Sequence, residues 1–345
     1  MKDKIKGCLY GLSIGDAIGL RYENIKPKDI NENNIGKVCF FGAISDDTEH
    51  MILISKSILN TENIKDFEND FKKELKKWLL SFPINIGKTT LYSIIKSFLK
   101  SEYGIKGTGN GSVMRIAPVG LIFHKDQNKL TEYASSSCKI THNSEESIIN
   151  SIAIAKLISE ILNRNWNKNN KPETDDVLNL LSSISKEEFW QNTVNELKEA
   201  IDKDIKPIDL VYSWTKGKGA VGYTKYSTLL SIYCWLKYYG NYEETVKEII
   251  KCGGDADTNA AIVGALAGAT IGYNEIPNQL KNKINDLTVS KKDIDNLSIA
   301  IIENKNIIRT NKIHYLGIFK NIFSLFYFIF LLIKVKLLSL FKIKH

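Results

Sequence analysis

Proline and strand-like patterns are both scarce in this sequence. Only 6 of its 345 residues are proline, and few segments alternate between polar and apolar residues. Apolar residues instead recur at the three- and four-residue spacing of a helix. This pattern predicts an all-α fold, a compact helical domain over residues 1–300. The clearest helical segments are residues 51–59, 67–80, 91–99, 148–162, 229–239 and 260–271.

Cysteine is present but lacks the spacing of a structural framework. The five cysteines lie far apart and form no Cys-x-x-Cys pair. This argues against a disulfide scaffold and a zinc site, and it favours a reducing, cytoplasmic compartment. The basic and apolar N-terminus resembles a signal peptide, but Asp16 interrupts its apolar stretch and no small-residue cleavage site follows. We therefore expect this segment to be the first helix of the mature protein.

The first 302 residues lack an excess of either charge. The chain has a net charge of +8, but residues 303–345 hold eight basic residues against Glu303 alone. The rest of the chain is nearly neutral, which argues against a nucleic-acid-binding domain. The 43% hydrophobic and 25% charged residues exclude a wholly disordered, collagenous or multi-span membrane protein.

The C-terminal segment, residues 301–345, differs from the domain before it. Its residues 321–333 form an uncharged run of 13 residues, about 20 Å as a helix against about 30 Å of bilayer hydrocarbon. If Lys320 snorkels to the interface, the run extends back to residue 315. Aromatic residues would surround this C-terminal hydrophobic helix. We expect membrane contact through residues 315–345, as a spanning or surface-lying anchor; a last core helix with a basic end is the alternative.

Two acidic clusters stand directly before helical segments. Residues 45–48 read Ser-Asp-Asp-Thr, and residues 253–259 read Gly-Gly-Asp-Ala-Asp-Thr-Asn. Either cluster alone is explained by helix capping and by the helix dipole. Together they offer the hard oxygen ligands that suit Mg²⁺ or Mn²⁺. If the clusters converged, each carboxylate pair at ~4 Å would repel by about 4 kcal/mol at an effective dielectric of 20, so cations would be needed.

Three other features are weak signals when taken singly. Residues 15–19 read Gly-Asp-Ala-Ile-Gly and precede Glu23, a lone acid of the kind that is usually solvated. The glycine-rich loop at residues 106–115 lacks the Lys-Ser/Thr of a P-loop, and no predicted strand precedes it, so a Rossmann fingerprint does not fit either. His142 follows Thr141, and a lone histidine is more often structural than functional.

In order and spacing, five motifs carry a resemblance. They are GDAIGLRYE (15–23), SDDT (45–48), GNGSVMRIAPVG (109–120), TH (141–142) and GGDADTNAAIVGALAGA (253–269). The set resembles the ADP-ribosylglycohydrolase family. The resemblance implies an orthogonal helical bundle with two Mg²⁺ or Mn²⁺ ions in a central cleft, and hydrolysis of an ADP-ribosyl bond at ribose C1″. The substrate would be an ADP-ribosylated protein or a small ADP-ribose conjugate, and we expect a monomer.

The resemblance also implies roles for individual residues. The metal ligands are Ser45, Asp46, Asp47, Asp255, Asp257, Thr258 and Glu23. The catalytic group comprises Glu23, Asp46, Asp47 and Asp257, with Glu23 or one aspartate as general base. The substrate-binding group comprises Asn85, Gly109, Asn110, Gly111, Ser112, Val113, Met114, Arg115, His142 and Tyr223.

One position departs from the family pattern. Asn85 stands where the related stretch of the family usually has an aspartate, and in the arginine-directed branch of the family this acid is implicated in handling the acceptor. The resemblance therefore leaves the acceptor open. Two other functions remain as alternatives: a non-catalytic ADP-ribose-binding protein of the same fold, and a metal-dependent phosphohydrolase that uses the same carboxylates.

Overall fold

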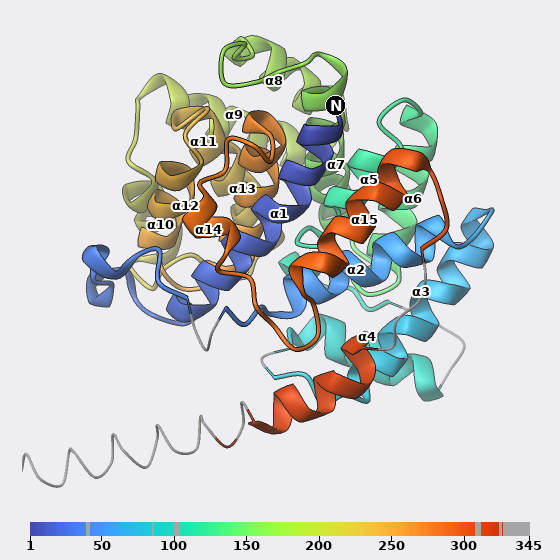
Figure 1. The fold of residues 1–345 in the computed structure, drawn as a ribbon. Coiled ribbons are helices and arrows are strands. Elements are labelled where there is room, and N and C mark those ends of the chain that lie inside the picture. The colour runs from blue at the N-terminus through green and yellow to red at the C-terminus, as the bar shows by residue number, and fades with distance from the viewer. Residues whose placement is uncertain (39–41, 85, 100–103, 308–311, 324–325, 327–345) are drawn as a thin grey trace, which may run out of the picture.

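The computed structural model describes residues 1–345 except 39–41, 85, 100–103, 308–311, 324–325 and 327–345 (Figure 1). The described residues form helices joined by turns and contain no β-strand, which confirms the all-α prediction. The α-helices are α1 (Lys2–Gly19), α2 (Asp46–Leu59), α3 (Ile64–Leu79), α4 (Lys88–Leu99), α5 (Ala117–Ile122), α6 (Gln127–Lys139), α7 (Glu145–Asn163), α8 (Thr174–Ser182), α9 (Glu188–Asp202), α10 (Pro207–Thr215), α11 (Thr224–Lys237), α12 (Tyr242–Lys251), α13 (Ala256–Ile271), α14 (Asn278–Lys281) and α15 (Lys291–Glu303). Short 3₁₀ turns are η1 (Leu20–Tyr22), η2 (Pro27–Asp29), η3 (Glu32–Asn34) and η4 (Asn110–Ser112).

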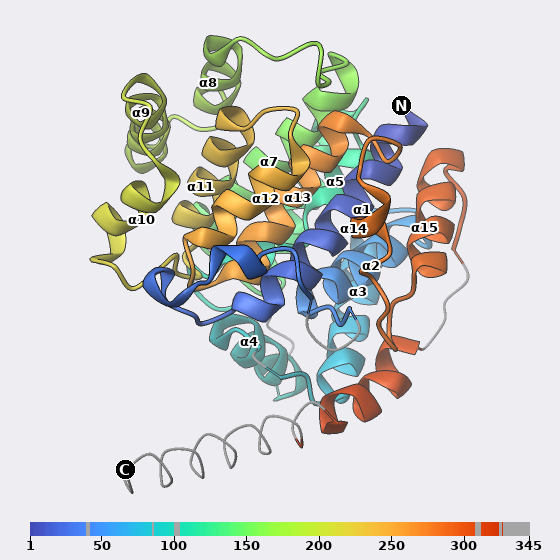
Figure 2. The same ribbon diagram turned by 60° about the vertical axis from the view of Figure 1, so that its left-hand side comes forward.

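Helices α1 and α13 form the buried centre of the domain (Figure 2). Glycine recurs at every fourth position of α1 and faces small residues of α13. A Cβ atom on Gly11 would lie 2.1 Å from the Gly264 carbonyl oxygen, and one on Gly15 would lie 2.1 Å from that of Ala260. Only glycine permits this close approach. The packing brings the C-terminal turn of α1, which carries Asp16, beside the first turn of α13.

The other helices pack around this pair. Helices α11 and α12 contact α13, and α7 links α11 to α5 and α6. Helices α8, α9 and α10 lie at one edge of the molecule, away from α2 and α3 (Figure 2). The two acidic helix starts, those of α2 and α13, are therefore held by the most buried part of the fold.

Part of the C-terminal segment is a helix that packs on the domain. Residues 312–323 are helical; the His314 ring lies 3.0 Å from a Glu74 carboxylate oxygen, and the Asn321 amide donates to the Ser81 carbonyl at 2.8 Å. Lys320 donates to the Glu49 carboxylate at 2.9 Å. The expectation that Lys320 snorkels to a membrane interface is wrong, because its ammonium lies in a protein ion pair.

The structure describes only part of the segment that was expected to form a membrane anchor, residues 315–345. Among the described residues, no helix is both long enough and apolar enough to cross a bilayer. The rest of the expected anchor, residues 324–325 and 327–345, lies outside the described residues.

Candidate active site and metal centre

The first turn of α2 presents its acids through a capped helix start. Ser45 is the N-cap, and its hydroxyl oxygen accepts the Asp47 backbone N–H at 3.2 Å. The same hydroxyl donates to the Asp47 carboxylate at 2.7 Å. The positive end of the helix dipole favours carboxylates here. Capping thus explains the local sequence, and it also fixes the direction of Asp46 and Asp47.

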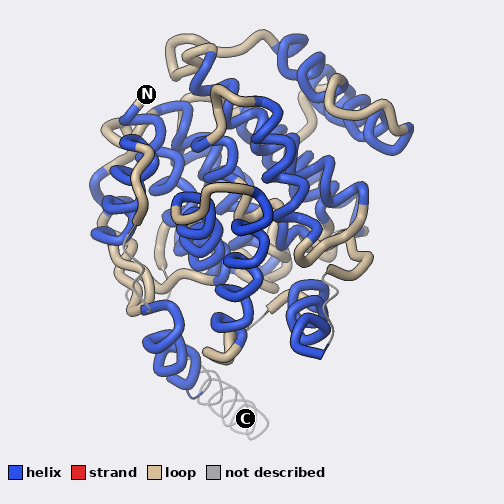
Figure 3. The backbone as a smooth tube through the Cα atoms, turned by 90° about the vertical axis from the view of Figure 1, so that its right-hand side faces the viewer, coloured by secondary structure: helices blue, strands red, loops and turns tan. Residues whose placement is uncertain are grey.

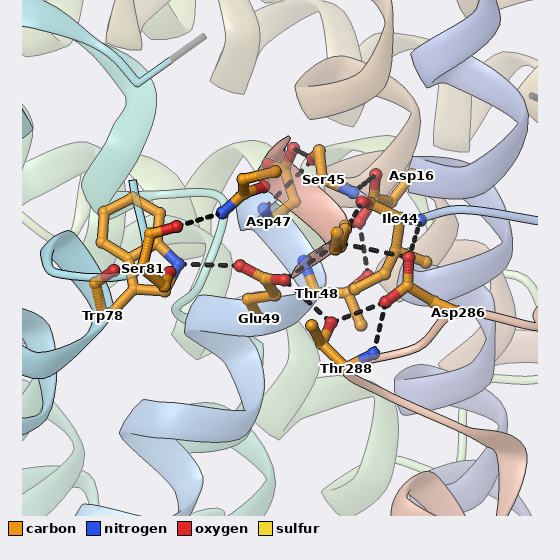
Figure 4. Close-up of polar contacts among 12 residues, drawn as sticks. Asp16, Ile44, Ser45, Asp47, Thr48, Glu49, Trp78, Ser81, Asp286 and Thr288 are labelled. Carbon is orange, nitrogen blue, oxygen red and sulfur yellow. Dashed lines mark hydrogen bonds and ion pairs between the residues drawn. The ribbon is translucent and has the colours of Figure 1, made fainter. Parts of the chain in front are cut away.

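Asp16 of α1 binds the first turn of α2 through hydrogen bonds. Its side chain is fully buried and accepts the Ser45 N–H at 2.9 Å, the Thr48 N–H at 3.1 Å and the Thr48 hydroxyl at 2.5 Å (Figure 4). Burial raises the pKa of Asp16 to about 6. Sequence reasoning gave Asp16 no role, although a carboxylate within a buried apolar helix is the signal that could have found it.

The two acidic helix starts meet in the structure. The Thr258 hydroxyl, in the first turn of α13, donates to the Asp47 carboxylate at 3.4 Å. Burial raises the pKa of both Asp47 and Asp257 well above the usual range, and neighbouring carboxylates raise them further. Removal from water, followed by the charges of Asp16 and Glu49, raises the pKa of Asp46 to about 8. Without a cation, burial and the neighbouring acids disfavour the charged forms of these carboxylates.

The donor set fits a hard divalent cation. Among the described residues, the Asp47 Oδ1 atom is buried without a hydrogen-bond partner, and the charges of Asp16, Asp46 and Asp255 act on the same carboxylate. A cation would supply the missing partner and lower the raised pKa values. As the described side chains lie, no three or more His, Cys, Asp or Glu groups form a ready ligand shell. Binding would therefore require the carboxylates to move closer together.

Backbone pairing brings Glu23 to the same place. The Asn24 N–H donates to the Gly254 carbonyl, and the Gly254 N–H donates to the Ile25 carbonyl, both at 2.7 Å. Gly254 has a φ of +71°, and a Cβ there would lie 1.9 Å from the Ala220 carbonyl oxygen. Glycine is required at this crossing, which places Glu23 beside the start of α13. The negative charge of Glu23 contributes to the raised pKa of Asp257.

The glycine-rich loop joins the site through Asn110. Its amide donates to Asp255 Oδ2 at 2.8 Å and to the Ser227 hydroxyl at 2.9 Å. Its backbone N–H donates to the Gly222 carbonyl at 3.1 Å. Tyr223, which follows Gly222 in the chain, donates a hydrogen bond from its hydroxyl to the Glu146 carboxylate. The loop, the Gly222–Tyr223 segment and Asp255 thus form one side of the site.

His142 lies directly beneath the loop. Its ring is almost fully buried, and Nδ1 lies 2.8 Å from the Thr141 hydroxyl. Burial, assisted by the charge of Arg115, lowers the pKa of His142 to about 3, so the ring is neutral. A Cβ on Gly109 would lie 3.2 Å from His142 Nε2, and one on Gly111 would lie 3.0 Å from Cε1. The ring therefore explains both glycines of the Gly-Asn-Gly sequence.

The remaining loop residues support the site from inside. Arg115 is fully buried and donates to the Gly111 carbonyl at 2.9 Å, the Ser137 carbonyl at 2.9 Å and the Thr141 hydroxyl at 2.7 Å. Its guanidinium fixes the loop by contacts within the protein. Substrate contact by this loop stays a prediction, and Asn85 lies outside the described residues. The other buried side chains of the loop are Ser112, Val113 and Met114.

A buried ion-pair network supports the other side of α2. Glu49 accepts the Trp78 indole N–H at 2.7 Å and the Lys320 ammonium at 2.9 Å. Lys320 also donates to the Ile44 carbonyl at 2.9 Å and lies 3.2 Å from Asp286. Burial alone would lower the pKa of Lys320, but the two carboxylates raise it. Figure 4 shows the Glu49 and Asp286 side of this network, one helical turn from the acids of the site.

Sequence reasoning missed this network because Glu49, Asp286 and Lys320 are far apart in the chain. The only signal was a lysine that interrupts an apolar run.

The sequence is similar to that of known proteins of one family. The sequence profile of the ADP-ribosylglycohydrolase family matches residues 1–307. The ADP-ribosyl-[dinitrogen reductase] glycohydrolase of Rhodospirillum rubrum is 22% identical over 84% of this chain and 92% of its own. The ADP-ribosylarginine hydrolase Tri1 of Serratia proteamaculans is 24% identical over 86% of this chain and 78% of its own.

A solved structure shares the fold. It is described as an ADP-ribosylglycohydrolase-related protein complex, and it matches with a TM-score of 0.63 and 20% identity over 89% of this chain and 99% of its own. The expected resemblance is confirmed by the profile, which covers most of the sequence. The chain belongs to the ADP-ribosylglycohydrolase family.

Proposed function

We propose that this chain is a metal-dependent hydrolase that removes ADP-ribose from a modified acceptor by cleaving the bond at ribose C1″. Family membership supports the hydrolysis of ADP-ribosyl groups. The observation that carries the metal-dependent form is the meeting of two acidic helix starts at Asp47, whose Oδ2 accepts the Thr258 hydroxyl and whose buried Oδ1 has no partner among the described residues. A set of buried carboxylates with raised pKa values is the electrostatic environment that a divalent cation stabilises.

The proposed ligands are those that the family resemblance implies, and each is oxygen-bearing. Two Mg²⁺ or Mn²⁺ ions would act as Lewis acids, lower the pKa of a water molecule and orient it toward C1″. Asp16 holds the ligand turn of α2 by accepting hydrogen bonds from Ser45 and Thr48. The proposed ligands are Ser45, Asp46, Asp47, Asp255, Asp257, Thr258 and Glu23.

The protein groups then have distinct tasks. Glu23 lies beside the start of α13 and is our choice of general base, with Asp257 next to it. Because the transition state of glycoside cleavage is oxocarbenium-like, the surrounding carboxylates would stabilise its positive charge. The backbone of Gly109 to Gly111 would bind the diphosphate and ribose, with neutral His142 beneath it and Tyr223 at its side.

The test is release of ADP-ribose from an ADP-ribosylated peptide in the presence of Mg²⁺ or Mn²⁺. We expect EDTA to abolish release and Asp257→Asn to reduce it severely. Asp204→Asn is the matched control, because its side chain is 88% exposed and pairs only with a surface lysine in the described contacts. Activity that survives both EDTA and Asp257→Asn would contradict the metal mechanism.

Product analysis separates the alternatives. Intact ADP-ribose supports the proposal, whereas release of inorganic phosphate supports a phosphohydrolase. Binding of ADP-ribose without turnover on any substrate supports a non-catalytic role. Because the name of the Serratia relative specifies arginine and Asn85 departs from the arginine-directed pattern, arginine-linked and serine-linked substrates both belong in the panel.

A further inference from the structure

Helix α4 is amphipathic in the reverse sense of an ordinary surface helix. Its buried side chains are mostly small and polar, and all but one of its exposed ones are apolar. Ser93 is fully buried and donates to the Thr141 carbonyl at 2.5 Å, whereas Tyr92 is 56% exposed and Leu99 is 80% exposed. A water-facing helix normally buries its apolar stripe. The exposed apolar side chains of α4 are Tyr92, Ile95, Phe98 and Leu99.

The C-terminal helix at residues 312–323 has the same reversed pattern. It packs on the domain mainly through polar contacts, those of His314, Lys320 and Asn321. Its outward side chains recur at helical spacing and are apolar; Phe319 is 69% exposed and Phe323 is 64% exposed. The full exposed set, continued by residue 326, is Tyr315, Leu316, Phe319, Ile322, Phe323 and Phe326.

These two helices lie at the lower end of the molecule in Figures 1 and 2, and Figure 3 shows helix 312–323 at that end from a third side, directly before the grey C-terminal trace. The loop between α3 and α4 lies with them, since Asn321 contacts Ser81 and the neighbouring Leu80 and Phe82 are exposed. Of the eighteen large hydrophobic side chains that are exposed among the described residues, thirteen fall within residues 80–99 and 315–326. We call this set the apolar end face. Such clustering marks an interaction site, unlike scattered exposed residues.

The two stretches of sequence that supply the apolar end face contain lysines and no acidic residue. The acids that contact helix 312–323 belong to other elements and are paired with His314, Lys320 and Lys312. The sequence has no acidic residue between Glu74 and Glu102 and none after Glu303. Lysines occur in both stretches, and the Lys76 ammonium lies 5.3 Å from the centre of the Phe98 ring. Exposed aromatics bordered by lysines are the chemistry of a helix that lies in the interface of an anionic bilayer.

We propose that the apolar end face binds the surface of an anionic lipid bilayer, with α4, the loop before it and helix 312–323 lying together at headgroup depth. This inference is independent of the proposed hydrolysis. It also differs from an anchor formed by the C-terminus alone, which would leave the exposed residues of α4 in water. Aromatic side chains are suited to this depth because the headgroup region accepts their amphipathic rings.

The face adjoins two supports of the candidate site. Ser93 of α4 contacts Thr141, next to His142, and Lys320 contacts Glu49, next to the ligand turn. A bilayer bound at this end would place the catalytic site close to the membrane surface, where membrane-associated acceptors are concentrated.

The experiment is flotation of the full chain with phosphatidylcholine vesicles that contain or lack phosphatidylglycerol. We expect binding to the anionic vesicles that weakens as salt is raised. Phe98→Ser with Leu99→Ser should weaken binding about tenfold, and Phe319→Ser with Phe323→Ser by a similar factor or more, because each pair removes inserted apolar area. Tyr212→Ser is the matched control, since Tyr212 is 38% exposed and lies on α10, away from the face.

Specific outcomes would overturn the proposal. Absence of binding to anionic vesicles is one, and unchanged binding of the α4 double variant is another, because the C-terminus alone would then suffice. Sedimentation without lipid tests a second copy of the chain as the occupant. A dimer that the same substitutions dissociate, and that vesicles do not displace, would make the face a protein interface. The variants should still hydrolyse a water-soluble peptide at the normal rate, so failure of the membrane proposal can be distinguished from failure of the proposed function.

Discussion

The acidic centre, formed by the first turns of α2 and α13, and the apolar end face differ in the side chains that they bury and expose. At the starts of α2 and α13, carboxylates are buried together and raise one another's pKa values. At the apolar end face, acids are absent from the sequence and aromatic side chains are exposed. The first arrangement is costly without cations, and the second is costly without an apolar neighbour. The buried carboxylates therefore indicate a cation as their partner, because a cation would relieve their repulsion. The exposed aromatic side chains indicate an apolar partner, because such a partner would remove them from water.

The largest expected effect is at the acidic centre. Asp47→Asn removes a buried charge and the unpartnered oxygen, so Mn²⁺ affinity should fall by more than the roughly 10- to 100-fold that is typical of residues behind metal ligands. The same change should raise the thermal stability of the metal-free protein, because it removes repulsion. Isothermal titration and thermal unfolding measure the two effects. A variant that binds Mn²⁺ normally would remove Asp47 from the ligand set.

The next effect concerns the lysine that links the two regions. Lys320→Met leaves Glu49 and Asp286 buried without their cation, so we expect a loss of about 3 kcal/mol in the free energy of unfolding. Mn²⁺ affinity should also fall, because the Ile44 carbonyl loses its donor just before the ligand turn. Urea unfolding measures the first effect. Lys312→Met is the control, since Lys312 is 43% exposed and surface pairs contribute little.

The next expected effect, smaller than that of Lys320→Met, is the pH dependence of the thermal stability of the metal-free protein. Its direction should be opposite to that of a protein stabilised by salt bridges. Burial raises the pKa of Asp16 to about 6 and that of Asp46 to about 8, whereas the unfolded chain titrates near 4. The folded state thus retains protons that the unfolded state has lost. The melting temperature should fall as pH rises from about 4 to about 8. Saturating Mg²⁺ or Mn²⁺ should abolish this fall; persistence of the fall with metal bound would contradict cation binding at these carboxylates.

The smallest effect concerns single charges at the apolar end face. Lys88→Gln removes one exposed lysine at the start of α4, and one lysine near an anionic surface contributes about 1 kcal/mol. Vesicle binding should therefore weaken about fivefold. Lys203→Gln on α9 is the matched control, since Lys203 is 64% exposed and distant from the face. If both substitutions weakened vesicle binding equally, the attraction to anionic lipid would depend on the total charge of the protein and not on the lysines at the apolar end face.

Much of the fold and part of the site were predictable from the sequence. Helical periodicity located the main helices, and the spacing of five motifs indicated the family. The meeting of the helix starts was a hypothesis until the Thr258–Asp47 contact was seen, because one sequence contains no information on which loops converge. Asp16 was noted only within its motif, since its role depends on contacts 29 and 32 residues away.

The C-terminal segment shows why the remainder could not be predicted. An apolar helix interrupted by Lys320 has the same sequence whether the lysine reaches solvent or a buried carboxylate. The choice depends on Glu49, which lies 271 residues earlier in the chain. Reversed amphipathicity is likewise invisible in periodicity alone, because the pattern shows that one face is apolar but not which face points inward.

Lys320 also separates two definitions of a domain. By homology, the family profile ends at residue 307; by side-chain contacts, the packed unit extends at least to Lys320, which pairs with Glu49 and Asp286. A chain shortened at the homology boundary would carry two uncompensated buried acids beside its ligand turn. Weak activity of such a fragment would then result from the loss of the Lys320 ion pairs. It would not show that a catalytic residue is defective.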